Sequence, residues 1–235
     1  MLLNWPFIVI LFVCTLLSVL SRKLTISASL AGGVIACLIF IGAGYIGVVM
    51  LATFFILGSA ATVWKLGLKQ RSGFAEKNKG RRTTAQVLAN GGVAAITGFV
   101  IWRYPAQKNL FLVMMAASLA SAIADTLSSE LGTVYGRKFY NIITLKKDTR
   151  GLDGVISIEG IIIGIIGSAL IAVIYALGFG WNKNFLWIII AGTVGNISDS
   201  VLGATLERRN LLHNDTVNFL NTLIAAITAL LLSFA

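Results

Sequence analysis

Two aspartates occupy similar positions in two apolar stretches of the sequence. Asp125 and Asp199 each stand near the end of a hydrophobic run, and each is followed by a hydroxyl residue. An acidic side chain at membrane depth is expensive to desolvate and usually serves a function. The sequence has a single histidine, which excludes a multi-histidine zinc site, and oxygen ligands favour Mg²⁺ or Mn²⁺. The two acids are therefore candidates for a divalent cation site; the alternative is a polar helix end that contacts water.

Amide side chains accompany these acids. Asn196 stands three residues before Asp199 and shares its helix face. Asn218 belongs to a polar stripe, with Asn214 and Asn221, at the start of the last apolar run. A helix cap would explain one of these residues but not a stripe two turns long. We therefore expect the stripe to face the same polar site as the acids.

Basic residues precede the helix that is predicted over 85–102. Arg81 and Arg82 come just before it, and Asn90 lies inside it. A helix N-terminus beside arginine or lysine is a suitable anion-binding site. The alternative is a topology signal, which would explain the arginines but not Asn90. The segment therefore predicts a phosphate site.

A polar segment between the fifth and sixth apolar runs combines bases, acids and glycines. Arg137 and Lys138 follow Gly136, and Lys146 and Lys147 come next, before a glycine-rich stretch. Lysine and arginine offset phosphate charge, glycines admit backbone N–H groups, and carboxylates hold Mg²⁺. A solvated charged loop is the alternative. There is no GxxxxGK[ST] motif, so a soluble P-loop NTPase is not expected.

Eight apolar runs must position these residues. The chain has 235 residues, of which 57% are hydrophobic and 12% charged, and its mean hydropathy is +0.88. A soluble domain carries about 25% charged residues, so lipid must be the solvent for much of this surface. The composition predicts an all-α, polytopic membrane helix bundle that forms one integral membrane domain over 1–235. The runs are 2–20, 24–43, 45–64, 85–102, 109–124 with a helical pattern that continues to about Gly132, 155–179, 185–206 and 217–234.

Charge is distributed unevenly between the predicted loops. Most of the 19 basic residues fall in the odd-numbered loops, and basic residues follow the first run but do not precede it. The positive-inside rule then places the odd loops in the cytoplasm and both termini outside, with about eight transmembrane helices. The net charge of +10 is attributed to orientation and anionic headgroups and not to nucleic acid. The 9 acidic residues also lie in or near the odd loops, which that rule does not require, so we expect the functional site at the cytoplasmic face.

Three motifs resemble those of a membrane-protein family that includes plant phytyl-phosphate kinase and human transmembrane protein nineteen. They are Ala124-Asp125-Thr126 with Ser129-Glu130-Leu131-Gly132, Gly195-Asn196 with Asp199-Ser200 and Glu207-Arg208, and Asn214-Asp215 with Asn218-Phe219-Leu220-Asn221-Thr222. The resemblance covers most of the chain. More distantly, Asp125, then Gly136-Arg137-Lys138, then Lys146-Lys147 resemble the order of motifs in dolichol and phytol kinases, which use CTP. Glu159-Gly160 lies further from the lysines than in that pattern.

The resemblance implies a CTP-dependent kinase that converts an isoprenyl monophosphate, such as phytyl phosphate, to the diphosphate. Mg²⁺ would be held by Asp125 and Asp199, with Glu130 and Asp215 as supporting ligands. Catalysis would consist of positioning and charge neutralisation, because a phosphate dianion needs no strong general base. The expected catalytic residues are Asp125, Asp199, Glu130 and Lys146. The expected contacts are Arg137, Lys146 and Lys147 for the nucleotide phosphates and Arg81, Arg82 and Asn90 for the lipid phosphate. Lys138, Asn196 and Asn218 are further expected nucleotide or phosphate contacts.

Two other classes of function remain open. One is a transporter or flippase of a lipid phosphate or small anion, although the acids cluster at one face and not at the midplane, where transporters bind. The other is a cytidylyltransferase that forms a CDP-lipid and releases pyrophosphate. The lipid chain length and the oligomeric state have no signal in the sequence.

Overall fold

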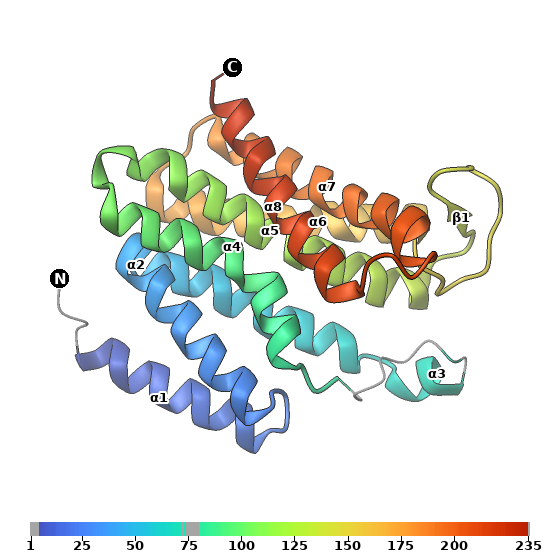
Figure 1. Ribbon diagram of the computed structural model, residues 1–235, viewed down its shortest axis with the longest axis horizontal. Coiled ribbons are helices and arrows are strands. Elements are labelled where there is room, and N and C mark those ends of the chain that lie inside the picture. Colours follow the sequence, from blue (N-terminus) through green and yellow to red (C-terminus); the bar gives the residue numbers. More distant parts are fainter. Residues whose placement is uncertain (1–4, 72, 74–79, 235) are drawn as a thin grey trace.

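The computed structural model describes residues 5–71, 73 and 80–234, and these residues form an almost wholly helical bundle (Figure 1). This confirms the predicted all-α class. The long helices are α1 (Trp5–Leu20), α2 (Ile26–Val63), α4 (Thr84–Arg103), α5 (Lys108–Tyr135), α6 (Ile158–Phe179), α7 (Asn184–Leu202) and α8 (Asn214–Ser233). The short elements are α3 (Leu66–Arg71), the 3₁₀ turn η1 (Pro105–Gln107), the strands β1 (Tyr140–Asn141) and β2 (Val155–Ile156), and the π-helical turn η2 (Gly203–Glu207). Of the acidic residues, Glu76 lies outside the described part of the chain.

Helix α2 contains a break at Gly44. This residue has φ of 64° and ψ of −153°, a conformation that glycine adopts without the steric cost of a Cβ atom. Figure 1 shows that the two arms, residues 26–43 and 45–63, run in different directions. The arms correspond to the predicted runs 24–43 and 45–64, so the boundary between the second and third runs is confirmed.

Six of the described helices are long and apolar enough to cross a membrane by length and composition. Helix α2 counts once in this number despite its break, and α1 is shorter, with 16 residues. The chain is therefore a polytopic membrane helix bundle. The count of about eight spans and the outside location of both termini stay predictions.

Helix α5 forms the centre of the bundle and packs against α2, α4, α6, α7 and α8. Its inner positions carry small residues, including Ala116, Ala120 and Ala124, all fully buried. Small side chains let helix backbones approach closely, which replaces the hydrophobic driving force that is missing in lipid. The same principle operates between α2 and α4, where a Cβ atom on Gly98 would lie 2.3 Å from the carbonyl oxygen of Leu38.

The segment between α5 and α6 differs from its prediction. Val155 and Ile156 do not begin a helix but pair as β2 with β1 in an antiparallel hairpin, with Tyr140 opposite Ile156. Helix α6 starts only at Ile158, where Ser157 Oγ accepts a hydrogen bond of 3.1 Å from the backbone N–H of Gly160. Hydrophobicity alone could not separate this apolar strand from the helix that follows it.

Candidate functional site

A polar cavity of about 550 Å³ lies between α4, α5, α7 and α8. In Figure 1 the ends of α5 and α7 that line it are on the same side of the bundle as α3 and β1. The loop over 151–157 and the turn η2 complete its wall. Seven of the predicted site residues line it: Arg82, Asn90, Asp125, Glu130, Asn196, Asp199 and Asn218. Residues from four separate segments of the sequence are thus brought to one place.

The carboxyl groups of Asp125 on α5 and Asp199 on α7 lie within hydrogen-bonding reach of each other. Asn221 Nδ2 donates to Asp199 Oδ2 at 2.7 Å, and Ser121 Oγ donates to Asn221 Oδ1 at 3.1 Å. This chain of bonds fixes the orientation of the Asp199 side chain. Two carboxylates at this separation repel each other unless a proton or a cation lies between them.

Arg82 reaches the cavity from the segment before α4 and is buried. Its guanidinium interacts with the carboxylate of Asp125 and lies 5.0 Å from the centroid of the Phe54 ring. Gly58 makes room for it, because a Cβ atom there would lie 2.7 Å from Arg82 Nη2. The planar guanidinium suits phosphate oxygens better than an ammonium group does. The cavity therefore joins a carboxylate pair to a buried cation.

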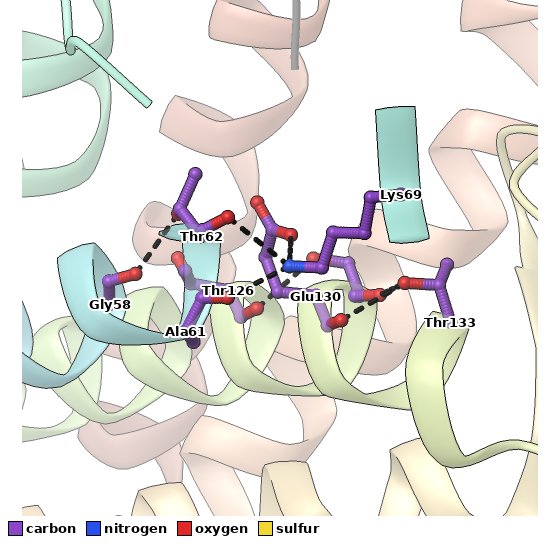
Figure 2. A network of polar contacts seen from close by, with 8 residues as sticks. Gly58, Ala61, Thr62, Lys69, Thr126, Glu130 and Thr133 are labelled. Atoms are coloured by element: carbon purple, nitrogen blue, oxygen red, sulfur yellow. Dashed lines mark hydrogen bonds and ion pairs between the residues drawn. The ribbon is translucent and has the colours of Figure 1, made fainter. Parts of the chain in front are cut away.

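Glu130 is engaged by a lysine that the sequence analysis did not single out. Lys69 Nζ donates to Glu130 Oε2 at 2.5 Å, to the carbonyl oxygen of Ala61 at 2.8 Å and to that of Thr62 at 3.3 Å. Figure 2 shows the ammonium group between these three acceptors. The Lys69 side chain is only 1% exposed, and that of Glu130 is 18% exposed. Glu130 thus neutralises a buried lysine that also satisfies carbonyl groups at the end of α2.

The amides of α7 and α8 point inward, as the polar stripe predicts. Asn196 Oδ1 accepts a hydrogen bond of 2.9 Å from Ser128 Oγ on α5. Helix α6 approaches closely at this level, because a Cβ atom on Gly164 would lie 2.6 Å from Asn196 Nδ2. Asn218 is buried and lines the cavity. Asn196 therefore holds α5 and α7 together, and Asn218 is available to the cavity from α8.

Glu207 lines the cavity although the sequence analysis quoted it only as part of a motif. It ends the π-helical turn η2, and its carboxylate experiences the negative charges of Asp153, Asp199 and Asp215. Single π-helical turns within helices occur often at functional sites because they redirect one side chain. The helix period that the sequence suggests would place Glu207 at a different angle, which explains why the residue was missed.

The segment over 148–157 is fastened to η2 and to Arg208, which follows this turn. Arg208 Nε donates to the carbonyl oxygen of Asp153 at 2.6 Å, and Arg208 Nη2 donates to Asp148 Oδ2 at 2.9 Å. The backbone N–H of Thr149 and then Arg208 hold the pKa of Asp148 below its ordinary value. Gly154, at φ of 70°, lies so close to η2 that a Cβ atom would be 2.3 Å from Ala204 Cβ. The wall of the cavity is therefore held in one position.

Several predicted phosphate contacts lie elsewhere. Arg137, Lys138 and Lys147 line a second cavity of about 210 Å³, which shares only Phe139 with the first. The side chain of Lys146 is exposed and lines neither cavity. Arg81 Nε donates to the carbonyl oxygen of Leu24 at 3.3 Å, away from the cavity wall. Asp215 lies in the first turn of α8 and does not line the cavity.

The oxygen-bearing side chains of the cavity suit Mg²⁺ better than a metal ion that takes most of its ligands from protein side chains. Within residues 5–71, 73 and 80–234, no three or more His, Cys, Asp or Glu side chains gather around a common ion position. Mg²⁺ commonly takes one or two carboxylates from the protein and completes its shell with water and phosphate oxygens. Asp125 and Asp199 supply such a pair, and the buried Oδ1 of Asn90 has no partner among the described residues. Glu130 and Asp215 were predicted as further metal ligands, but the described residues contain no cluster in which they surround one ion position together with Asp125 and Asp199.

The fold and this cavity define a polytopic integral membrane protein with a polar site between its helices. Residues 9–226 match the model of the family described as integral membrane protein DUF92, and the chain belongs to that family.

Relatives occur in plants, archaea and cyanobacteria. The chain is 30% identical over 229 residues to the chloroplastic protein VTE6 of Arabidopsis thaliana, which covers 92% of this chain and 69% of the relative. It is 32% identical over 234 residues to an uncharacterised membrane protein of Methanocaldococcus jannaschii, covering 96% and 93%. It is 31% identical over 202 residues to an uncharacterised membrane protein of a Synechocystis strain, covering 84% and 78%. No solved structure matches the chain.

Proposed function

We propose that this protein is a kinase that uses CTP to convert an isoprenyl monophosphate to the diphosphate at the cytoplasmic face of the membrane. The observation that carries the proposal is the cavity in which the Asp125–Asp199 pair faces the buried guanidinium of Arg82. The resemblance of the motifs to phytyl-phosphate kinase supports the substrate class. The relationship to the chloroplastic protein VTE6 over most of the chain agrees with it.

The proposed reaction needs no proton transfer. An oxygen of the lipid phosphate attacks the γ-phosphorus of CTP, the bond from that phosphorus to the β–γ bridging oxygen breaks, and CDP leaves with the electron pair. The second pKa of a phosphate ester is about 6, so the nucleophile is largely a dianion at neutral pH. The protein therefore has to position the two phosphates and to reduce the repulsion between them.

The residues of the cavity divide this task. Arg82 binds the lipid phosphate, because it lines the cavity with a guanidinium that packs against Phe54 and Gly58. Asp125 and Asp199 would hold Mg²⁺, which would offset phosphate charge when bound. Arg137, Lys138 and Lys147 stay proposed contacts for the nucleotide, which would extend past Phe139 from one cavity to the other. Asn218 would hydrogen-bond the nucleotide from α8.

Product analysis tests the proposal directly. Purified protein in liposomes is incubated with Mg²⁺, CTP and phytyl phosphate, and the products are identified by mass spectrometry. We expect CDP and phytyl diphosphate in equal amounts. Pyrophosphate with CDP-phytol would instead identify a cytidylyltransferase. The absence of turnover with several nucleotides and lipid phosphates, together with movement of the lipid phosphate between leaflets, would identify a transporter.

A further inference from the structure

Asn90 has one polar atom that the protein leaves without a partner. The residue is 5% exposed and lines the cavity from α4. Its Nδ2 donates to the carbonyl oxygen of Gln86 at 2.9 Å, one turn earlier in the same helix. Its Oδ1 is buried and accepts no hydrogen bond from any described residue. Buried polar atoms without a partner are rare in proteins, so this oxygen needs an explanation.

The orientation of the Asn90 amide follows from its neighbour. A backbone carbonyl oxygen only accepts hydrogen bonds, so the group that faces Gln86 O must be the NH₂ group. Exchange of the two amide atoms would place two acceptors against each other. Oδ1 of Asn90 is therefore an acceptor that is left without a partner among the described residues, and one of the two N–H groups of its Nδ2 is engaged by the helix.

An acceptor is the wrong partner for a phosphate dianion, whose oxygens are also acceptors. A contact between Asn90 and the lipid phosphate, as predicted from the sequence, would use the second N–H of Nδ2 and would leave Oδ1 without a partner. A hard cation is a suitable partner, since asparagine carbonyl oxygens coordinate Mg²⁺ and Ca²⁺ together with carboxylates. The chemistry of Oδ1 thus matches that of the Asp125–Asp199 pair and not that of Arg82.

Helix α8 connects Asn90 with the carboxylate pair. Asn221 Nδ2 bonds Asp199 on α7 at 2.7 Å. The next residue, Thr222, donates from Oγ1 to the carbonyl oxygen of Ala89 on α4 at 3.4 Å. Two adjacent residues of α8 therefore contact Asp199 on one side and the residue before Asn90 on the other. This places the start of α4 and the acid-bearing part of α7 at one level of the bundle.

We infer that Asn90 Oδ1 is a third protein ligand of a divalent cation bound by Asp125 and Asp199. Asn221 is then a positioning residue, because it orients Asp199 through one amide and is itself held by Ser121. Such outer partners orient metal ligands in many sites. The inference deepens the proposed kinase function and rests on it for the identity of the cation. The site itself is tested without nucleotide or lipid substrate.

The experiment measures binding of Mn²⁺ to the purified, full-length protein in detergent by electron paramagnetic resonance, with neither CTP nor lipid phosphate present. Asn90→Leu removes the amide at similar volume, and Asn90→Asp replaces its oxygen with a carboxylate. Thr97→Val is the matched control, because Thr97 is buried on the same helix and bonds only the carbonyl oxygens of Val93 and Ala94. Thermal melting of each variant shows whether the bundle is folded.

We expect Asn90→Leu to weaken Mn²⁺ binding by about tenfold or more, the range seen when groups that support a metal site are removed. Asn90→Asp should retain binding, and Thr97→Val should match the wild type. Equal Mn²⁺ affinity in the wild type and Asn90→Leu would overturn the inference. So would the absence of Mn²⁺ binding by the wild type, or a loss of binding in Asn90→Leu that Asn90→Asp shares.

The Mn²⁺-binding result for the Asn90 variants can be interpreted independently of the test for kinase activity. Loss of Mn²⁺ binding in Asn90→Leu supports the ligand assignment even if the wild type makes no lipid diphosphate. Formation of the diphosphate by the wild type, with unchanged Mn²⁺ binding in Asn90→Leu, upholds the kinase and removes Asn90 from the metal site.

Discussion

The two acidic regions of the cavity are built in opposite ways. On the side of α2 and α3, Glu130 is paired with Lys69, and the three donors of that lysine are all used within the protein. On the side of α7 and α8, Asp125 and Asp199 face each other, and the nearby Asn90 leaves an acceptor without a partner. The first region is complete without a ligand, whereas the second brings two carboxyl groups together and leaves one buried amide oxygen without a partner among the described residues.

This difference distinguishes a structural carboxylate, that of Glu130, from the carboxylates proposed to function, those of Asp125 and Asp199. The sequence alone does not make this distinction. An acid that completes a buried ion pair contributes mainly by preventing an isolated charge, which would be very costly in a low-dielectric interior. An acid beside another acid lowers stability unless a cation or proton is present. Substitutions in the Lys69–Glu130 region should therefore mainly change stability, whereas substitutions in the Asp125–Asp199 region should mainly change activity.

Substitution of Asp125 or Asp199 should have the largest effect on activity. We expect Asp125→Asn to reduce the rate of lipid diphosphate formation by about 100-fold to 1,000-fold, the range for loss of one electrostatic contact to a transition state. Its melting temperature should change little, since the substitution removes both the repulsion from Asp199 and the attraction to Arg82. Steady-state rates and thermal melting in detergent check both parts. A nearly normal rate would remove Asp125 from the cation site.

Breaking the Lys69–Glu130 pair should primarily affect stability. Glu130→Gln leaves the buried Lys69 charge without its counter-ion, and we expect a loss of about 3–5 kcal/mol of stability. The double variant Lys69→Met with Glu130→Gln should recover a large part of it, because no isolated charge remains. Thermal melting of both single variants and the double variant forms a complete cycle. Additive losses in the double variant would show that the pair is not coupled.

A smaller effect should follow from displacing Arg82 without changing its charge. In Gly58→Ala the new methyl group would meet Arg82 Nη2 at 2.7 Å, and the flexible end of the arginine can move aside while the helix stays intact. We expect the KM for phytyl phosphate to rise roughly tenfold, in line with one weakened hydrogen bond to a charged group. Gly67→Ala is the control, because a Cβ atom there meets nothing within 4 Å. An unchanged KM in Gly58→Ala would argue against a phosphate at Arg82.

The smallest effect is expected at Asp148, which Arg208 ties to the end of η2. The pKa of Asp148 is held below 3.8, first by the backbone N–H of Thr149 and then by Arg208. A depressed pKa means that the folded state favours the carboxylate, so its contribution is present above the ordinary pKa and is lost as pH falls through the lowered one. The difference in melting temperature between wild type and Asp148→Asn should therefore be small at neutral pH and disappear in strong acid. A difference that grew on acidification would contradict this sign.

The sequence predicts the helical framework well because the relevant signals are local. Hydrophobic runs of the right length define the helices, and Gly44 interrupts two runs in a way that the backbone confirms. The matching depth of Asp125 and Asp199 is also recovered, since each stands near the end of its own run. The strand at Val155 was assigned to a helix because its hydrophobicity has no distinguishing period.

Contacts between distant segments could not be predicted in the same way. Lys69 and Glu130 are 61 residues apart, and no local pattern relates them. The exposed side chain of Lys146 and the separate cavity at Arg137 depend on how the β1–β2 hairpin folds, which charge spacing does not reveal. The angle of Glu207 depends on a π-helical turn, and the direction of the Asn90 amide depends on a hydrogen bond to Gln86.

One measurement tests the contrast between the two regions most directly: the rate of phytyl diphosphate formation by Asp199→Asn and by the Lys69→Met, Glu130→Gln double variant, both shown to be folded. We expect Asp199→Asn to lose most of its activity, whereas the double variant should retain a rate within about tenfold of the wild type. An active Asp199→Asn protein beside an inactive, folded double variant would contradict the assignment and move the reaction to the Glu130 side of the cavity.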